Sequence, residues 1–314
     1  MSDPNSIPII TVFGGGGFIG RYACEHLLKH DVRLRVAERQ PKRASRLQPL
    51  GDVGQVALMP ADLTRPATVQ RAVVNASAVI NLVGTFDGDL ESVHVEGART
   101  AALAAKEAGA KAFVHVSAIG ADPDATSVYG RTKGEGEQAV RDAFPGATIL
   151  RPSVVFGPED EFTNRFASMS ILPFLPVLAP KCRFQPVFAG DLGKAIAEAA
   201  LRPDRHGGKT YDIAGPDVLT MHELNERIAR MAGRSPQIVD LPDFVGDAMS
   251  RLGFLPGAPI SRDQWLMLQS DNVADPARPG LADMGIEATP LAQAAPEWLG
   301  RYRKGGRFAV SETA

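Results

Sequence analysis

The stretch that decides the fold is IITVFGGGGFIGR, residues 9–21. Its first five residues predict a short buried strand, and the pattern after the glycines predicts an amphipathic helix through Leu28. A tight turn from strand to helix needs positive φ, which glycine adopts without steric cost, and bare backbone can approach a pyrophosphate at the positive end of the helix. Four consecutive glycines alone would also suit a flexible loop, but the flanking strand and helix favour a dinucleotide-binding turn. We expect the contacts to come from Gly14, Gly17, Phe18, Ile19 and Gly20.

The composition is that of an ordinary globular chain of 314 residues with a formal charge of -2. The chain lacks the basic excess of a nucleic-acid-binding protein, and no apolar run is long enough to cross a bilayer. Cys24 and Cys182 are too few for a disulfide framework and fit a reducing compartment. The first residues do not resemble a targeting peptide, so we expect a cytoplasmic protein.

Short apolar strands alternate with helical patterns through the first half of the chain. Further strands are predicted at 33–37, 55–59, 78–83 and 112–116, with helices at 66–74 and 90–108, and the alternation continues through Arg151. This alternation predicts a doubly wound, parallel α/β sheet with helices on both faces. We assign residues 1–151 to a nucleotide-binding core, and residues 152–314 to a smaller mixed region that completes the sheet and forms a substrate or partner cleft.

The end of the second predicted strand lies where the adenosine ribose binds in a dinucleotide fold. An acidic residue there accepts hydrogen bonds from the ribose and favours NAD, whereas arginine accommodates the extra phosphate of NADP. This chain has Glu38 followed by Arg39, with Lys42 and Arg43 nearby. If Glu38 rotates outward, the basic cluster can hold the phosphate, so we predict NADP (as NADPH) in preference to NAD. A solvated charged loop is the alternative.

Other strand ends supply further cofactor candidates. Asp62 follows the third strand, where it could reach the adenine amine or cap the helix at 66–74. The carboxyl end of the fourth strand, closed by Gly84, is expected to face the cofactor. The remaining cofactor-binding candidates at these strand ends are Leu63, Val83 and Pro152.

A second motif carries the chemistry. Ser117 ends the fifth strand, and Tyr129 and Lys133 stand four residues apart on one face of the next helix. A neighbouring ammonium is expected to lower the pKa of the tyrosine phenol, which would make Tyr129 a proton donor or acceptor near neutral pH. Ser117 would polarise a carbonyl or alcohol, and Lys133 could hold the nicotinamide ribose. Two non-catalytic alternatives stay open. Tyr129 could cap the helix with Lys133 as a surface charge, or these residues could hold a cofactor that is never turned over.

The glycine turn, Ser117, Tyr129 and Lys133 resemble the short-chain dehydrogenase/reductase superfamily, in its extended or atypical branches that include NAD-dependent epimerases and dehydratases. Further stretches are similar to the family of the nucleotide-binding accessory subunit of respiratory complex I (alpha-subcomplex subunit nine), including its bacterial relatives. The resemblance spans nearly the whole chain. It rests on VEGAR at 95–99, VSAIGAD at 116–122, RPSVVFGPED at 151–160, FQPVF at 184–188, Gly215-Pro216, and the segment 263–273.

This resemblance implies tightly held NADPH and a link to complex I or to ubiquinone metabolism. It assigns the 2′-phosphate contact to Arg39 and an acid/base pair to Tyr129 and Lys133. The chain departs from the family pattern in two places. Glu38 argues against the NADP preference, because a carboxylate at this position favours NAD. The short connection from Ile119 to Ser127 leaves little room for a substrate loop, so the exact role of Ser117 stays open. Lacking a transit peptide, the chain is expected to be a bacterial relative, cytoplasmic or peripheral at the inner face of the membrane.

Two functions therefore remain open. One is a nucleotide-binding or assembly protein that uses the cofactor as a structural element and partners a membrane-bound respiratory or quinone-biosynthesis complex. The other is an NAD(P)-dependent oxidoreductase or epimerase-type enzyme that acts on a hydrophobic carbonyl, sterol-like or quinone-like substrate through Tyr129 and Lys133. The sequence does not decide whether the protein is an enzyme.

The second half has a different pattern. The stretch 171–180 contains three prolines, which forbid a helix and disfavour a sheet interior, so we expect either buried packing or an exposed apolar patch. Thr220 and Glu223 form a predicted capping box. His94, His115, His206 and His222 lack metal-ligand spacing, and no metal is assigned. Further helices are expected at 160–169, from Asp191 to Leu201, at 263–268 and at 291–302, with a strand at 210–213 and a frayed end from Lys304.

Overall fold

The computed structural model describes residues 7–253 and 260–306, and the chain divides into two compact units. Unit 1 contains the chain up to Pro152 together with Ala189–Ile213 and Asp275–Glu287. Unit 2 contains Ser153–Phe188, Ala214–Ala274 and the chain from Ala288 onward. The chain first passes from unit 1 to unit 2 after Pro152, one residue from the division predicted after residue 151. Two later segments of the chain return to unit 1.

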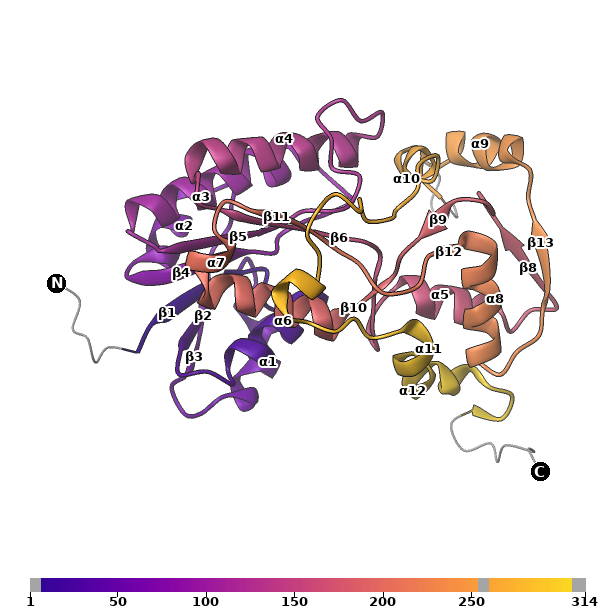
Figure 1. The fold of residues 1–314 in the computed structure, drawn as a ribbon, viewed down its shortest axis with the longest axis horizontal. Helices are drawn as coiled ribbons and strands as arrows, with labels where there is room; N and C mark the ends of the chain where they lie inside the picture. The colour runs from indigo at the N-terminus through magenta and orange to yellow at the C-terminus, as the bar shows by residue number, and fades with distance from the viewer. Residues whose placement is uncertain (1–6, 254–259, 307–314) are drawn as a thin grey trace. The chain divides into compact units, whose positions relative to one another are not determined.

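Unit 1 is built on a seven-stranded sheet in which every pair of neighbouring strands is parallel (Figure 1). The strand order is β3-β2-β1-β4-β5-β6-β11. This is the strand order of a dinucleotide-binding fold extended by one strand, and it confirms the predicted doubly wound parallel sheet. The strands are β1 (Ile9–Phe13), β2 (Arg33–Glu38), β3 (Val56–Pro60), β4 (Ala76–Asn81), β5 (Ala112–Val116), β6 (Thr148–Pro152) and β11 (Thr210–Ile213).

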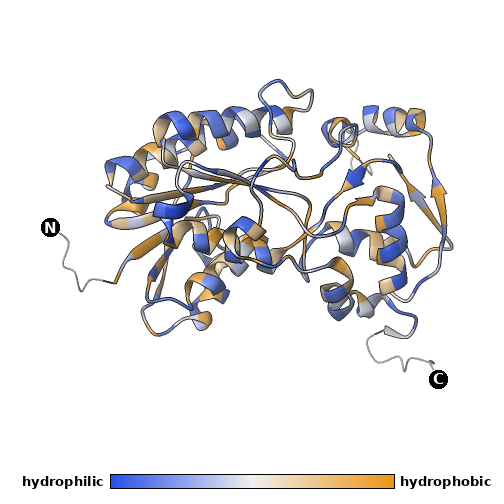
Figure 2. Ribbon diagram, in the orientation of Figure 1, coloured by the Kyte–Doolittle hydropathy of each residue, from blue (hydrophilic) through white to orange (hydrophobic). Residues whose placement is uncertain are grey.

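Helices cover both faces of this sheet, as its uninterrupted apolar strands require. On one face α1 (Phe18–Leu27) packs against α6 (Ala189–Leu201), and on the other lie α2 (Pro66–Val73), α3 (Ala98–Glu107) and α4 (Val128–Ala143). Gly193 lets α6 approach α1 closely, because a Cβ there would lie 2.7 Å from the backbone of Tyr22. Figure 2 shows β1 in the colours of hydrophobic residues, whereas α4 carries hydrophilic residues along its outer side.

Short elements complete unit 1. They are the 3₁₀ segments η1 (Pro41–Leu50) and η3 (Ala282–Met284), the π-helical turn η2 (Ser92–Gly97) and the helix α7 (Pro203–His206). The predicted single α-helix over 90–108 is therefore wrong in its first part, where η2 precedes α3. Gly136 allows α4 to pack closely against η2, because a Cβ at this position would overlap the carbonyl oxygen of His94.

Unit 2 packs three two-stranded sheets with helices around one apolar core. Thr220 and Glu223 form the predicted capping box on α8, and Ser261 caps α10 in the same way. The predicted helix over 291–302 is instead broken into α11, α12 and η4, and Pro296, which cannot donate a backbone hydrogen bond, opens α12. The elements are β7 (Val155–Phe156), α5 (Phe162–Met169), β8 (Phe174–Val177), β9 (Arg183–Phe184), β10 (Val187–Phe188), β12 (Leu219–Thr220), α8 (Met221–Met231), β13 (Gln237–Asp240), α9 (Asp243–Arg251), α10 (Arg262–Met267), α11 (Leu291–Ala294), α12 (Pro296–Leu299) and η4 (Gly300–Tyr302).

The proline-rich stretch 171–180 contains a strand that the sequence did not predict. β8 pairs in parallel with β13, and these two strands form a sheet of their own, so Pro176 removes no bond from a sheet interior. Both expectations for this stretch hold in part. Leu175 and Val177 are buried, whereas Leu172 and Phe174 are more than half exposed. The predicted frayed end falls partly on residues 307–314, outside the described residues.

Candidate functional site

The strand order reverses between β1 and β4, and the loops at the carboxyl ends of these strands gather most of the predicted site residues. Gly14 follows β1 with φ +80°, in the left-handed region that favours glycine. The N–H of Gly17 donates to the carbonyl of Gly14 at 3.1 Å, and Gly17 is the N-cap of α1. A Cβ on Gly20 would lie 2.5 Å from the carbonyl oxygens of Gly14 and Gly15. The turn is therefore defined by close backbone contacts and is not a flexible loop.

The N-terminus of α1 carries no side-chain cap, and its first residues are the predicted Phe18 and Ile19. Four N–H groups at the start of a helix lack intrahelical partners and attract anions. The glycine backbone and the helix end without a side-chain cap together fit a dinucleotide pyrophosphate.

At the end of β2, Glu38 turns inward. One of its carboxylate oxygens accepts a hydrogen bond from the N–H of Gly16 at 2.6 Å, so the predicted outward rotation of Glu38 is wrong for this structure. The guanidinium of Arg46 donates to the carbonyl of the same Gly16 at 3.0 Å. The peptide units on both sides of Gly16 are thus held from η1 and β2. Arg39, which follows Glu38 in the chain, and Arg43 on η1 are exposed.

Arg46 is a residue that the sequence analysis missed. It lies on η1, which packs against α1 and β2. The sequence signal was the basic character of the whole 39–46 segment, which does not say which side chain folds back onto the glycine turn.

After β3, Asp62 stabilises a turn and does not cap α2. One oxygen of its carboxylate accepts from the N–H and hydroxyl of Thr64 at 3.0 and 2.8 Å, whereas the N-cap of α2 is Arg65 and has no side-chain bond. Burial favours the neutral acid, but the Thr64 hydrogen bonds outweigh it and lower the pKa of Asp62. Leu63 is buried against Gly97. The capping alternative is therefore wrong, and the ionised Asp62 stays compatible with an adenine contact.

The end of β4 lies directly against the glycine turn. A Cβ on Gly14 would be 3.3 Å from the side chain of Val83, and the N–H of Val83 donates to Asn81 at 3.1 Å. The next residue, Gly84, is exposed. Val83 and Gly84 are thus brought to the phosphate end of the site, at the point where the strand order reverses.

The second cluster is built by β5 and α4. The ammonium of Lys133 donates to the carbonyl of Val116, next to Ser117, at 2.8 Å, and both Lys133 and Ser117 are buried. The hydroxyl of Ser117 has no hydrogen-bond partner among the described residues. A buried hydroxyl without a partner is costly in a native protein, so this orphaned group fits a site that a polar ligand completes. The predicted Pro152 lies nearby in the chain fold, since its carbonyl accepts from Ile119 at 2.9 Å.

Tyr129 stands in the first turn of α4 between two aromatic rings. Phe86 stacks on it with ring centroids 4.4 Å apart and an interplanar angle of 16°, and His94 meets it edge-on at 5.4 Å. Burial raises the pKa of Tyr129 to about 12 and lowers the pKa of Lys133 to about 8. The prediction that Lys133 lowers the phenol pKa is therefore wrong for the protein without ligand, because burial dominates and the ammonium is bound to the backbone.

His94, which the sequence analysis considered only as a metal ligand, connects the two sides of this cluster. Its Nε2 accepts from the N–H of Thr85 at 3.1 Å, so Nδ1 carries the proton and donates to the Thr132 hydroxyl at 2.9 Å. Burial, with the Lys133 charge, lowers the pKa of His94 to about 4. The neutral ring therefore ties the loop after β4 to α4. The available sequence signal was a histidine between two valines.

The connection from Ile119 to Ser127 folds back onto α4. The N–H of Asp122 donates to the carbonyl of Gly130 at 3.1 Å, and a Cβ on Gly134 would overlap the backbone at Asp122 and Pro123. The short connection therefore packs on the helix that carries Tyr129.

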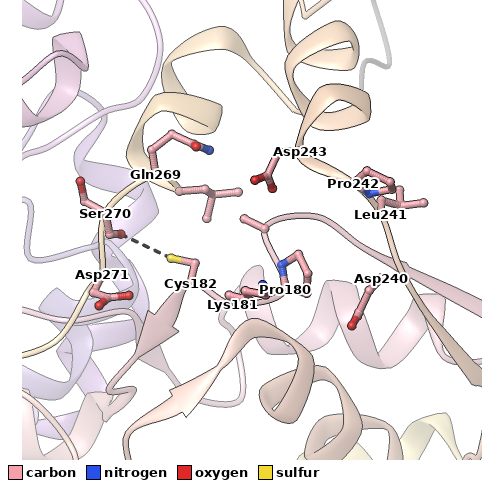
Figure 3. Close-up of a pocket in the computed structure, with 12 residues that line it drawn as sticks. Pro180, Lys181, Cys182, Asp240, Leu241, Pro242, Asp243, Gln269, Ser270 and Asp271 are labelled. Atoms are coloured by element: carbon pink, nitrogen blue, oxygen red, sulfur yellow. Dashed lines mark hydrogen bonds between the residues drawn. The ribbon is translucent and has the colours of Figure 1, made fainter.

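Unit 2 contains a separate cavity of about 510 Å³ (Figure 3). Its walls come from residues 179–182, 240–243 and 268–271, and Cys182 donates a long 3.4 Å hydrogen bond to the carbonyl of Ser270. None of the predicted site residues lies in it. Neither cysteine forms a disulfide. In residues 7–253 and 260–306, no group of side chains could hold a metal ion, and none of the helices is long and apolar enough to cross a membrane.

Known proteins agree with this geometry. A family profile described as NAD(P)H-binding matches residues 14–165. NADH dehydrogenase [ubiquinone] 1 alpha subcomplex subunit 9 of Rattus norvegicus is 36% identical over 304 residues, which cover 94% of this chain and 80% of that protein. This chain belongs to the alpha subcomplex subunit 9 family. This family member is therefore an NAD(P)H-binding protein.

Two proteins that are named as reductases are also similar to this chain. Ceramide reductase of Caulobacter vibrioides is 30% identical over 241 residues, which cover 75% of this chain and 74% of that protein. Triphenylmethane reductase of Citrobacter sp., solved with NADP(H), has a TM-score of 0.75 at 18% identity and covers 92% of this chain and 99% of its own. The latter similarity establishes the fold only.

Proposed function

We propose that this protein holds NADPH in preference to NADH and works with a membrane-bound respiratory or quinone-biosynthesis complex. The observation that carries the proposal is the glycine turn from Gly14 to Gly20 at the uncapped start of α1. It lies beside the reversal point of the sheet, where open α/β sheets bind their ligands.

Each part of the dinucleotide has candidate contacts on unit 1. The glycine turn, with the first N–H groups of α1, would hold the pyrophosphate. Asp62 and Leu63 would contact the adenine, and Val83 with Gly84 would line the middle of the cofactor. Tyr129, Lys133 and Pro152 would surround the nicotinamide ribose and ring. When bound, the reduced nicotinamide supplies a hydride.

The preference for NADPH rests on charge at the ribose end. Arg39, Arg43 and Arg46 supply exposed positive charge beside the turn, and a guanidinium binds phosphate with charge-assisted hydrogen bonds. Glu38 is the opposing group, since a carboxylate repels a 2′-phosphate. Its bond to Gly16 engages one carboxylate oxygen in the protein.

The proposed partner follows from the named relatives. The Rattus norvegicus protein is named as a subunit of an NADH dehydrogenase [ubiquinone], and the match covers nearly all of this chain. We propose a peripheral location at the inner face of a bacterial membrane. Pull-down of the tagged protein from solubilised membranes would test this, with recovery in the soluble fraction alone as the contrary result.

Native mass spectrometry of protein purified without added cofactor tests the cofactor proposal, followed by identification of any released nucleotide. NADPH at full occupancy that resists oxidation by carbonyl compounds would support a structural cofactor. An empty site that exchanges NADPH readily would favour an enzyme. Retention of NADH alone would refute the NADPH preference.

A second candidate is a reductase or dehydrogenase, and the orphaned hydroxyl of Ser117 favours it. In this function Ser117 would donate a hydrogen bond to a substrate carbonyl, and Tyr129 would deliver the proton that the resulting alkoxide takes up. Lys133 would take part in one of two ways. It would release the Val116 carbonyl, or it would keep this hydrogen bond while its positive charge stabilises the phenolate of Tyr129. NADPH oxidation assayed over a panel of apolar carbonyl compounds tests this function.

A further inference from the structure

We propose that His94 is a positioning residue, which fixes Tyr129 relative to the loop after β4 through a directed chain of hydrogen bonds. The consequence for turnover rests on the reductase candidate proposed above. His94 and Thr132 lie outside the catalytic and cofactor-binding groups named for that candidate.

One assignment of protons satisfies every polar contact of the His94 ring. The N–H of Thr85 can only donate, so Nε2 of His94 accepts it at 3.1 Å and carries no proton. Burial lowers the pKa of His94 to about 4, so the ring is neutral and its one proton lies on Nδ1. Nδ1 donates to the hydroxyl of Thr132 at 2.9 Å, and this hydroxyl donates its own proton to the carbonyl of Tyr129 at 3.2 Å. The chain of hydrogen bonds therefore runs without a break from the loop to Tyr129.

The position of His94 is also fixed by packing. Its side chain is 2% exposed and lies in the π-helical turn η2, a kind of turn that is frequent at functional sites. Its carbonyl oxygen is so close to α4 that a Cβ on Gly136 would overlap it. Its ring meets the Tyr129 ring edge to face, with centroids 5.4 Å apart. Movement of the ring would therefore break both hydrogen bonds and the contact with Tyr129.

The other end of the chain lies beside cofactor candidates. Thr85 follows Val83 and Gly84, and Val83 lies against Gly14 of the glycine turn. A fixed Thr85 N–H therefore sets the path of the loop between the phosphate end of the site and Tyr129. A reductase needs its general acid at a fixed distance from the reacting carbon, and a displacement of about 1 Å can cost about a hundredfold in rate. His94 would maintain this distance without touching the substrate.

NMR spectroscopy tests the chain without any need for turnover. In nitrogen spectra of histidine-labelled protein near neutral pH, Nδ1 of His94 should carry the proton and Nε2 should carry none. The amide of Thr85 should exchange with deuterium about tenfold faster in Thr132→Val, which lacks the hydroxyl, and less than about twofold faster in Thr132→Ser, which keeps it. A proton on Nε2, or equal exchange of Thr85 in the two variants, would overturn the inference.

Turnover supplies a readout that a loss of packing alone would not give. In Thr132→Val we expect kcat for NADPH oxidation to fall about tenfold to hundredfold while KM changes less than about threefold, because Tyr129 is displaced and the substrate contacts remain. Thr132→Ser should restore kcat to within about twofold of the unsubstituted protein. His94→Gln, whose amide oxygen can accept from Thr85, should retain more activity than His94→Phe, which keeps an aromatic ring without either hydrogen bond.

His206→Phe is the matched control. His206 is also a buried histidine of unit 1, and its Nδ1 lies 2.8 Å from the hydroxyl of Tyr211. The control variant should lower the Tm as His94→Phe does, but leave kcat and the exchange of the Thr85 amide unchanged. Equal losses of kcat in the two variants would make His94 a stabilising core residue only and would overturn the inference.

The inference and the reductase proposal fail separately. Protection of the Thr85 amide that depends on the Thr132 hydroxyl, in a protein without any turnover, would refute the reductase and support the chain. Turnover that depends on Tyr129 but is the same in Thr132→Val would support the reductase and refute the positioning role.

Discussion

The two ends of the candidate site in unit 1 are built differently. The phosphate end consists of backbone, where Gly14 has positive φ and Gly20 lets α1 approach the turn to within contact distance. The other end consists of side chains, and two of them already have protein partners. Lys133 is bound to a strand carbonyl, and Tyr129 lies between Phe86 and His94.

The two ends also differ in how their interaction with a ligand depends on pH. Backbone N–H groups and a helix terminus attract phosphate in the same way at any physiological pH. The Tyr129 end instead depends on protonation, because burial separates the pKa of Tyr129, about 12, from that of Lys133, about 8. We therefore expect substitutions in the glycine turn to change cofactor affinity, and substitutions of the side chains around Tyr129 to change any turnover.

The largest expected effect comes from Tyr129→Phe, which separates the two ends. If the protein is a reductase, kcat should fall by about 10²- to 10⁴-fold because the general acid is lost. The Kd of NADPH should change by less than about twofold, since the phosphate end is intact. Steady-state kinetics and a binding titration measure both, with Tyr302→Phe in unit 2 as the control. Unchanged turnover would remove Tyr129 from the mechanism.

Lys133→Met should reveal the buried ammonium in the pH dependence of stability. The folded pKa of about 8 lies below the ordinary value of 10.5, so between these values the unfolded chain binds more protons and stability rises with pH. The free energy of unfolding of the unsubstituted protein, relative to Lys133→Met, should increase by roughly 1–3 kcal/mol from pH 7 to pH 10.5. Denaturant titrations across this range measure it. A constant difference would contradict the buried charge.

Gly20→Ala should disrupt the phosphate end by overlap. Its Cβ would lie 2.5 Å from two carbonyl oxygens, so we expect a loss of about 1–3 kcal/mol in the free energy of unfolding, and weaker NADPH binding, although alanine usually favours helices over glycine. Gly146→Ala, whose nearest contact is the Phe144 ring at 3.5 Å, should stay within about 0.5 kcal/mol. Equal melting curves for both variants would show that the turn relaxes without cost.

The smallest expected effect concerns nucleotide choice. Arg39→Ala should weaken NADPH by about tenfold and NADH by less than about twofold, because only NADPH carries the 2′-phosphate. Fluorescence titration with both nucleotides measures the ratio, and Arg33→Ala at the opposite end of β2 is the control. An equal loss for both nucleotides would refute the phosphate assignment.

The features that the sequence predicted well are local ones. Residues 9–21 predicted β1, the turn and α1, because strand and helix periods and the glycine requirement all act within a few residues. The capping box at Thr220 is equally local. The seven-stranded parallel sheet follows from the repeated strand–helix alternation.

The features that the sequence missed depend on partners distant in the chain. β8 exists because β13, some sixty residues later, supplies its hydrogen bonds. Glu38 turns inward because Gly16, on another loop, offers an N–H, and His94 gains its role from Thr85 and Thr132. A local pattern contains no information about such pairs.

By itself, the amino-acid sequence determined the nucleotide-binding fold, the glycine turn and the positions of Ser117, Tyr129 and Lys133 along it. Tertiary structure alone decided how those groups are charged and paired. A pKa depends on desolvation and on neighbours brought together by folding, so burial sets the protonation of Tyr129 and Lys133. The same folding places Phe86, which no motif includes, on the face of Tyr129.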